Sequence, residues 1–284
     1  CSDWAFTIRH RGTCICASCR VWHSMTALSG SPITAMDALP AKARAAAGRY
    51  RIGREMARAA CRLSVIIPTL DEQDHIRPLL DDLAALRRDG HELILVDGGS
   101  SDSTRAAASG LVDRIIATGR GRALQMNAGA GTATGDIFWF LHADSRVPPG
   151  AAKALVRACA DGHAWGRFDV RLSGGHWLLR VVERSMNLRS CISGVATGDQ
   201  GIFVARESFA AVGGFPELPL MEDIALSKAL RRHARPHCIR QPRLLTSSRR
   251  WEERGVLRTI LLMWRLRLAY LLGMEPRRLA RLYR

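Results

Sequence analysis

The sequence contains no run of about eighteen uncharged apolar residues, the minimum for a conventional membrane-spanning helix, although 47% of its 284 residues are hydrophobic. It also shows no apolar segment behind a basic start, so we expect no secretory signal peptide. Internal repeats and low-complexity tracts are absent too. These absences predict a cytoplasmic globular protein with one sizeable core.

Acidic residues are scarce, with 26 against 42 Lys and Arg, and the net charge is +16. Such an excess predicts attraction to nucleic acid, an acidic membrane surface or a phosphorylated substrate. Biased codon usage that favours Arg and Ala is the alternative cause. No helix-turn-helix, zinc-finger or aromatic RNA-binding signature accompanies the charge, so we expect no nucleic-acid partner.

The cysteines show no disulfide framework, because those from Cys61 onward occur singly, as reduced thiols do in a cytosolic protein. Cys14, Cys16 and Cys19 are closely spaced and could ligate zinc or an iron–sulfur centre, with His23 as the nearest further ligand. Residues 1–60 lack periodic apolar segments, however. We therefore favour a disordered extension or an extended gene model for this region, with a short helix around residues 40–60.

From residue 63 onward, apolar strands alternate with amphipathic helices. This alternation predicts an α/β fold with a mostly parallel sheet flanked by helices. The predicted strands are 63–68, 93–96, 114–118, 137–141, 167–172 and 201–204. The predicted helices are 76–86, a short one after 101–103, 122–132, 151–160, 177–188, 222–233 and 255–272.

Two of the predicted strands end in loops rich in carboxylates and hydroxyls. The first runs into Asp71 and Glu72, and the second ends at Asp97. Loops of this kind at the carboxyl edge of a parallel sheet form a ligand site that suits a sugar nucleotide. Asp97 could accept the imide N–H of a uracil-type base, with Gly98 and Gly99 allowing close approach. An Asx-turn is the structural alternative.

Further along the chain, Arg120 and Arg122 flank a glycine and suit a diphosphate, or else belong to a solvated basic loop. Asp144 follows the strand IFWFL and is well placed to hold a divalent cation that bridges two phosphates, or to cap the next helix. His142 would be a less usual magnesium ligand but is acceptable to manganese.

Glu222 and Asp223 open a predicted helix, where acidic residues complement the helix dipole and where a catalytic base could equally lie. Arg249, Arg250 and Trp251 form a basic and aromatic cluster. This cluster could stabilise a leaving phosphate or simply pack.

These motifs occur in register over residues 63–284, as SVIIPTLDE, VDGGSSDST, GRALQMNAG, GDIFWFLHADS, GDQGIFV, GGFPELPLMED and RRW. In this order they resemble the family 2 glycosyltransferases of the GT-A fold. The variants HADS, GDQGIFVARESF and SSRRWEERG are most similar to a bacterial subfamily called arsenosugar-biosynthesis glycosyltransferases, found beside radical-SAM and selenium- or arsenic-related genes.

The resemblance implies a GT-A domain over residues 61–284 that moves a sugar from a UDP- or GDP-linked donor to an unknown acceptor, with inversion and a divalent Mg²⁺ or Mn²⁺ ion. It implies Asp223 as general base with Glu222 beside it, Asp144 and His142 at the metal, and Gly198, Asp199 and Gln200 at the acceptor. The implied nucleotide-sugar contacts are Pro68, Thr69, Asp71, Glu72, Asp97, Gly99, Ser100, Arg122, Asn127, Ala143, Asp144, Arg250 and Trp251.

Two positions depart from the family pattern. His142 replaces the first acidic residue of the DxD motif, and Gly98 replaces a second aspartate after Asp97. Two other functions remain open, a polyprenyl-phosphate sugar synthase and a sugar-nucleotide-binding protein without catalysis. The basic, amphipathic helix 255–272 is expected to pack on the core with one solvated face, or to contact an anionic membrane peripherally.

Overall fold

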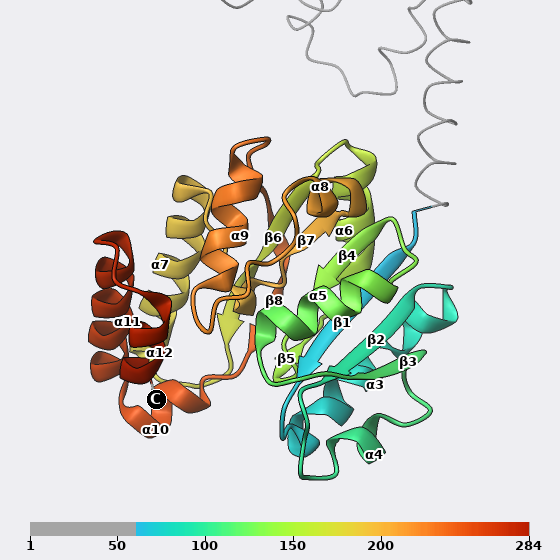
Figure 1. Cartoon of the computed structure of the whole chain (residues 1–284), viewed down its shortest axis with the longest axis horizontal. Coiled ribbons are helices and arrows are strands. Elements are labelled where there is room, and N and C mark those ends of the chain that lie inside the picture. The colour runs from blue at the N-terminus through green and yellow to red at the C-terminus, as the bar shows by residue number, and fades with distance from the viewer. Residues whose placement is uncertain (1–60, 284) are drawn as a thin grey trace, which may run out of the picture. The chain divides into compact units, whose positions relative to one another are not determined.

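The computed structural model describes residues 61–283. The expectations for residues 1–60, including the cysteine cluster and the short helix, therefore lie outside the described residues, as does residue 284. The centre of the fold is an eight-stranded sheet in the order β3-β2-β1-β4-β7-β6-β8-β5 (Figure 1). Its strands are β1 (Leu63–Thr69), β2 (Glu92–Asp97), β3 (Arg114–Ala117), β4 (Ile137–Phe140), β5 (Ser145–Arg146), β6 (Trp165–Leu172), β7 (Phe203–Ala205) and β8 (His237–Thr246).

The sheet is mixed, with parallel pairing in the half that carries the predicted ligand loops. β1 pairs in parallel with both β2 and β4, and β2 pairs in parallel with β3. β7 is antiparallel to β4 and to β6, whereas β6 and β8 are parallel. The carboxyl ends of β1, β2 and β4 consequently lie at one edge of the sheet, as the sequence predicted.

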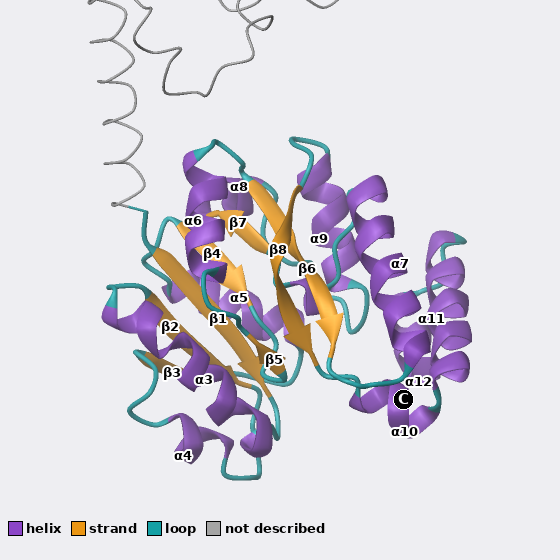
Figure 2. Ribbon diagram, turned by 180° about the vertical axis from the view of Figure 1, so that it is seen from behind, coloured by secondary structure: helices purple, strands orange, loops and turns teal. Residues whose placement is uncertain are grey.

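Helices cover both faces of the sheet. Figure 1 has α5 and α9 in front, and Figure 2, seen from behind, has α3 in front. The helices are α3 (Gln73–Arg88), α4 (Thr104–Ala108), α5 (Arg122–Thr132), α6 (Ala151–Ala160), α7 (Trp177–Ser193), α8 (Arg206–Ala211), α9 (Glu222–Arg231), α10 (Arg249–Arg254), α11 (Val256–Leu271) and α12 (Pro276–Tyr283). A 3-10 helix, η1, spans Gly198–Gln200.

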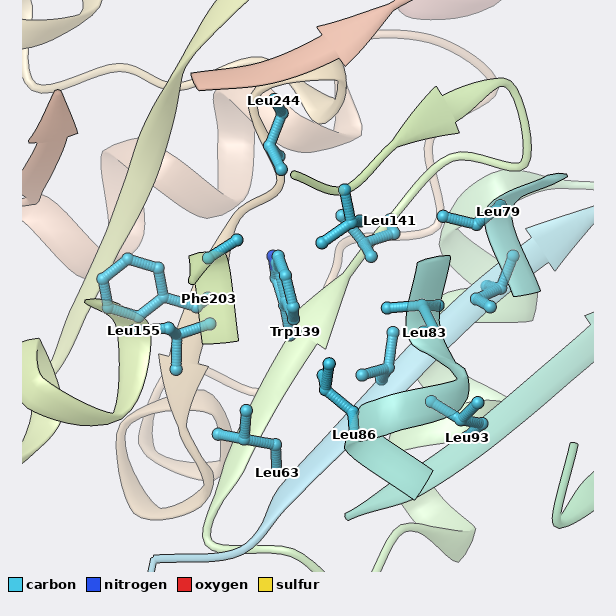
Figure 3. Close-up of a cluster of buried hydrophobic side chains, with 14 of the residues drawn as sticks. Leu63, Leu79, Leu83, Leu86, Leu93, Trp139, Leu141, Leu155, Phe203 and Leu244 are labelled. Atoms are coloured by element: carbon cyan, nitrogen blue, oxygen red, sulfur yellow. The ribbon is translucent and has the colours of Figure 1, made fainter. Parts of the chain in front are cut away.

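The strand residues alternate between two hydrophobic clusters because successive side chains on a strand point to opposite faces. Val65 and Ile67 join the cluster that contains Leu79 and Leu83 of α3, whereas Ile66 joins the cluster of α5 and α9. Trp139 is fully buried in the first cluster, where it lies among leucines from several elements (Figure 3). Burial on both faces explains why these strands read as continuous apolar runs.

Most predicted elements are present, and the helix predicted at 122–132 has those bounds in the structure. The prediction missed β8, α8, α10, α12 and the two-residue β5. β8 has the sequence HCIRQPRLLT, in which charged residues and a proline interrupt the apolar pattern. Its strand conformation is stabilised by pairing with β6 and β5, which its own sequence does not indicate.

The C-terminal helices form a separate small cluster at one end of the sheet. Leu266 of α11 and Leu279 of α12 are buried against Met221 and Ile224 at the start of α9. None of the helices in the described part of the chain is both long and apolar enough to cross a lipid bilayer.

Candidate active site

The loops after β1 and β2 are tied together by hydrogen bonds. The Asp71 amide donates to Ser100 Oγ at 3.0 Å, and Asp71 Oδ1 accepts from the Ser101 amide at 2.8 Å. Asp71 has a positive φ of 55°, which is uncommon for a residue other than glycine. The two loops therefore form one rigid unit at the sheet edge, and the Asp71 carboxylate is part of that unit.

Asp97 is almost fully buried at the end of β2. Its carboxylate accepts the amide N–H of Ser100 at 3.2 Å and also the Ser100 hydroxyl. The contact reaches three residues along the chain, one residue further than in an Asx-turn. These bonds fix the Asp97 oxygens at the sheet edge.

Glu72 and Asp144 bring two carboxylates together from the loops after β1 and β4. Burial raises the pKa of Glu72, and the nearby Asp144 carboxylate raises it further. Glu72 Oε2 is buried with no hydrogen-bond partner in the described structure. A pocket of about 220 Å³ opens beside Asp144 and is lined by residues of α3 and β8, including His75 and Thr246.

His142 connects the end of β4 with η1. Its Nδ1 lies 3.2 Å from Asp199 Oδ1, and a Cβ added to Gly198 would lie 2.5 Å from His142 Nε2. The Gly198 amide in turn donates to Asp223 Oδ2 at 2.9 Å. His142, η1 and the start of α9 are thus in direct contact, although they are far apart in sequence.

Asp223 and Glu222 occupy the first turn of α9. Asp223 Oδ1 accepts the Ile224 amide at 2.7 Å, so backbone N–H groups orient both carboxylate oxygens. Met221, the residue before the helix, has a positive φ of 69°. Glu222 is buried, and this burial and the neighbouring Asp223 raise its pKa, against the opposing effect of Arg122. Arg122, the first residue of α5, is therefore close to α9.

Two arginines that no sequence motif marked, Arg189 and Arg267, lie near Asp223. Burial, and then the nearby Arg267, lower the pKa of Arg189 to about 10. Arg189 Nη2 is buried without a hydrogen-bond partner among the described residues. Burial also lowers the pKa of Arg267, which the Asp223 and Asp199 carboxylates oppose. The pair forms a local concentration of positive charge beside the candidate base.

Several predicted contact residues also have structural partners. The Asn127 side chain forms hydrogen bonds with both the amide and the carbonyl of Phe215, at 2.9 and 2.8 Å. Gln200 is fully buried and donates to Ser190 Oγ at 2.9 Å. Ala143 belongs to the hydrophobic core. The structure thus gives these side chains roles in positioning loops and in packing.

The remaining predicted residues differ in burial and in their contacts. Thr69 is buried at the end of β1 beside Pro68, whereas Gly99 is exposed in the next loop. Trp251 packs against a cluster that includes Leu172 and Leu179, which supports the packing alternative for this ring. The side chain of Arg250 lies outside the described part of the structure.

The structure also adds Gln125, a buried residue of α5. Its Nε2 donates to the carbonyls of Thr69 and Val96, at 2.7 and 2.8 Å, and it lies against Gly98. An isolated glutamine within a helix gives no signal in sequence, and neither did Arg189 or Arg267, which read as ordinary polar residues of amphipathic helices. Only the packing of the helices identifies these residues.

A comparison with family models matches residues 64–209, more than half of the chain, to the model described as Glycosyl transferase family 2. The chain belongs to this family. The matched region contains the loops with Asp97 and Asp144 and the helix η1, whereas Asp223 and the rest of α9 lie beyond it.

The curated relatives resemble only part of this family 2 protein. Undecaprenyl-phosphate 4-deoxy-4-formamido-L-arabinose transferase of Yersinia pestis bv. Antiqua (strain Angola) is 33% identical over 113 residues. That match covers 36% of this chain and 35% of the relative, so the chain aligns with about a third of the relative's length.

Solved structures show the same fold. The S. aureus protein TarS in complex with UDP-GlcNAc has a TM-score of 0.55 at 18% identity, with 66% of this chain and 58% of TarS covered. Glucosyl-3-phosphoglycerate synthase from Mycobacterium tuberculosis, in complex with Mg²⁺ and UDP, has a TM-score of 0.51 at 20% identity, with 69% and 73% covered. The predicted GT-A fold, a mostly parallel sheet flanked by helices, is confirmed.

Proposed function

We propose that this family 2 protein transfers a sugar from a nucleoside-diphosphate donor to an acceptor nucleophile, with inversion at the anomeric carbon. The observation that carries the proposal is the position of Asp223. Its carboxylate is oriented by backbone N–H groups and touches η1, which is connected through His142 to the loop carrying Asp144. A base for the acceptor and the groups for the donor therefore share one sheet edge.

In the proposed reaction, Asp223 removes the proton of an acceptor hydroxyl as the acceptor oxygen bonds to the anomeric carbon. The bond from that carbon to the diphosphate oxygen breaks, and its electron pair leaves with the nucleoside diphosphate. Arg122 at the start of α5 supports the charge that develops there, since the helix N-terminus and a guanidinium both favour an anion. Asp97 and the glycines after it bind the nucleobase, with a UDP-sugar as the first donor to test.

The residues present suit a divalent ion of the Mg²⁺ or Mn²⁺ type. No cluster of three or more His, Cys, Asp or Glu residues arranged to hold a metal exists between residues 61 and 283. Mg²⁺ is often bound by one or two carboxylates together with substrate phosphates, so a complete protein cage is unnecessary. Asp144 and the unpartnered Glu72 oxygen offer two carboxylates, and a bound ion would offset negative charge on the diphosphate. His142 remains a predicted further ligand.

Replacing Asp223 with Asn tests the proposed base. General base catalysis typically contributes about 10²–10⁴-fold, so turnover should fall by that factor while donor affinity stays nearly constant. Turnover is measured as nucleoside diphosphate released, and donor affinity by calorimetry. Asp81→Asn, an exposed change on α3, is the matched control and should leave both unchanged. Normal turnover in Asp223→Asn would show that Asp223 is not the base. Donor binding by the wild type without any release of nucleoside diphosphate would indicate a binding protein.

The arginine pair supports a second candidate acceptor, a polyprenyl phosphate, as the names of the curated relatives suggest. Arg189 and Arg267 place two cationic groups beside Asp223, and Arg189 has an unsatisfied buried donor. Guanidinium groups bind phosphate oxygens well. A phosphate oxygen is already anionic near neutral pH, so such an acceptor needs less help from a base.

Steady-state kinetics with both acceptor types distinguish the candidates. With a polyprenyl phosphate acceptor, Arg267→Gln should raise KM strongly and Asp223→Asn should have the smaller effect. With a hydroxyl acceptor the order of the two effects should reverse. Failure of every lipid phosphate to accept sugar, together with turnover on a hydroxyl acceptor, would reject the second candidate.

A further inference from the structure

A stripe of exposed apolar side chains runs along α11. Leu257, Leu261, Trp264, Leu268 and Leu271 recur every three or four residues and are between 59% and 75% exposed. On a helix this spacing places all five on one face. The opposite side of α11 contains the buried Thr259 and Leu266. The outward face, here called the α11 stripe, therefore has no partner in the described structure.

The position and size of the stripe are unusual for a surface that faces water. In Figures 1 and 2 α11 lies at the outer edge of the described chain. The neighbouring helix α7 also carries an exposed apolar series, at Trp177, Val181, Leu188 and Ile192. Contiguous apolar patches of this kind mark sites of interaction with a protein or a membrane.

The charges beside the stripe distinguish between these partners. Arg258 and Arg265 are exposed on α11 and flank the stripe on one side. Between residues 256 and 283 the chain has arginines at 258, 265, 267, 277, 278 and 281, and Glu275 is the single acidic residue. Two copies of this surface placed face to face would bring like charges together. An anionic lipid surface complements both the apolar stripe and its basic border.

We infer that α11 docks in the plane of an anionic membrane surface, with the α11 stripe inserted at the level of the lipid headgroups. A helix with an apolar face containing leucine and tryptophan and with arginines on its border is the sequence type that binds membranes in this way. Tryptophan is also enriched at the membrane interface. The inner side of the same helix carries Arg267 beside the candidate active site, so docking would place that site close to the lipid surface.

Vesicle co-sedimentation of the full chain tests the docking surface. Binding is expected to vesicles that contain phosphatidylglycerol, to weaken with added salt, and to be weak with phosphatidylcholine alone. A basic residue near an anionic surface contributes about fivefold in affinity, so Arg258→Gln with Arg265→Gln should weaken binding about 25-fold. Arg88→Gln with Arg105→Gln removes the same charge from exposed positions on α3 and α4, and should have a much smaller effect.

The apolar contribution is tested by Leu261→Glu with Trp264→Glu, which should abolish binding. Ala84→Glu with Ala85→Glu on α3 makes the same change in net charge and should retain most of it. Because Leu261 and Trp264 are exposed, the fold should not depend on them, and circular dichroism checks this. A shift of tryptophan emission to shorter wavelength on anionic vesicles, lost in Trp264→Phe, is the independent readout.

Equal binding to neutral and anionic vesicles, or no binding, would overturn the inference. So would light scattering that shows a dimer dissociated by Leu261→Glu with Trp264→Glu, because a second copy would then cover the stripe. These outcomes are separate from the proposed reaction, since an enzyme that acts on a water-soluble acceptor could still bind vesicles.

Discussion

Glu222 and Glu92 are both buried carboxylates, but their environments shift their pKa values in opposite directions. Burial and the adjacent Asp223 raise the pKa of Glu222. Burial also opposes ionisation of Glu92, but hydrogen bonds from Ser64 and Thr134 outweigh it and lower the pKa. The ionised form of Glu222, beside the candidate base, is thus disfavoured by its surroundings. The ionised form of Glu92 is stabilised by hydrogen bonds.

Glu222→Gln and Glu92→Gln should therefore show opposite pH dependences of stability. Between its unfolded and raised folded pKa values, Glu222 binds more protons in the folded state, so its contribution to stability falls as pH rises. Relative to the wild type, Glu222→Gln should gain melting temperature from acidic to neutral pH. Glu92 stabilises the fold above its unfolded pKa, so Glu92→Gln should be most destabilised at neutral pH and recover as pH falls.

Thermal unfolding of both variants and the wild type across this pH range checks the prediction. The two substitutions are chemically identical, so each serves as the control for the other. Parallel trends in the two variants would contradict a raised pKa of Glu222 in the folded protein.

At the scale of elements, α5 positions the predicted nucleotide edge because it packs very closely on β1 and β2. A Cβ added to Gly129 would lie 2.5 Å from Ile66 Cγ2 and 3.0 Å from Val96 Cγ2. Both neighbours are buried, β-branched side chains with little freedom to move. The helix could not sit at this depth with any larger residue at 129.

Gly129→Ala should accordingly destabilise the protein by about 1–3 kcal/mol, the usual cost of overpacking a core. Gly131→Ala lies on the same helix with nothing within 4 Å of the new Cβ. That change should be neutral or stabilise by up to about 1 kcal/mol, because alanine is the better helix former. Urea unfolding measures both, and equal stabilities of the two variants would contradict the close packing of α5.

Whether a strand could be predicted from the sequence depended on how fully the strand is buried in the sheet. β1, β2 and β4 are buried on both faces, and their apolar runs made them visible in the sequence. β8 carries several exposed polar residues and pairs along its edges, so its apolar pattern is weak. Its strand conformation depends on β6, which is separated from it by more than sixty residues.

On the scale of the whole molecule, the C-terminal helices support the start of α9. Leu266 is buried among Met221, Ile224 and Leu279, next to Glu222 and Asp223. The backbone of Met221 has a positive φ, and a non-glycine residue holds this conformation when the surrounding packing fixes it. The last two helices thereby help to hold the candidate base in place.

Leu266→Ala should destabilise the protein by about 2–5 kcal/mol, as large-to-small changes in a core do. It should also lower turnover, because the start of α9 loses its support. Leu268 lies about half a helical turn from Leu266, on the exposed side of α11. Leu268→Ala should therefore change stability by less than about 0.5 kcal/mol. Calorimetric melting and the nucleoside-diphosphate assay test the pair, and normal turnover in a folded Leu266→Ala protein would contradict the supporting role.

The α/β layout, the family and the residues at the carboxyl ends of β1, β2 and β4 could all be read from the sequence, because a strand buried on both faces and a polar loop after it are local patterns. Which of these residues keep free polar atoms depends on the tertiary structure. It pairs the Asn127 side chain with the Phe215 backbone and Gln200 with Ser190 of α7, and it brings Arg189 and Arg267 beside Asp223. It also leaves an oxygen of Glu72 without a hydrogen-bond partner among the described residues. Hydrogen bonding and burial of these groups depend on segments distant in sequence, and no local pattern records those contacts.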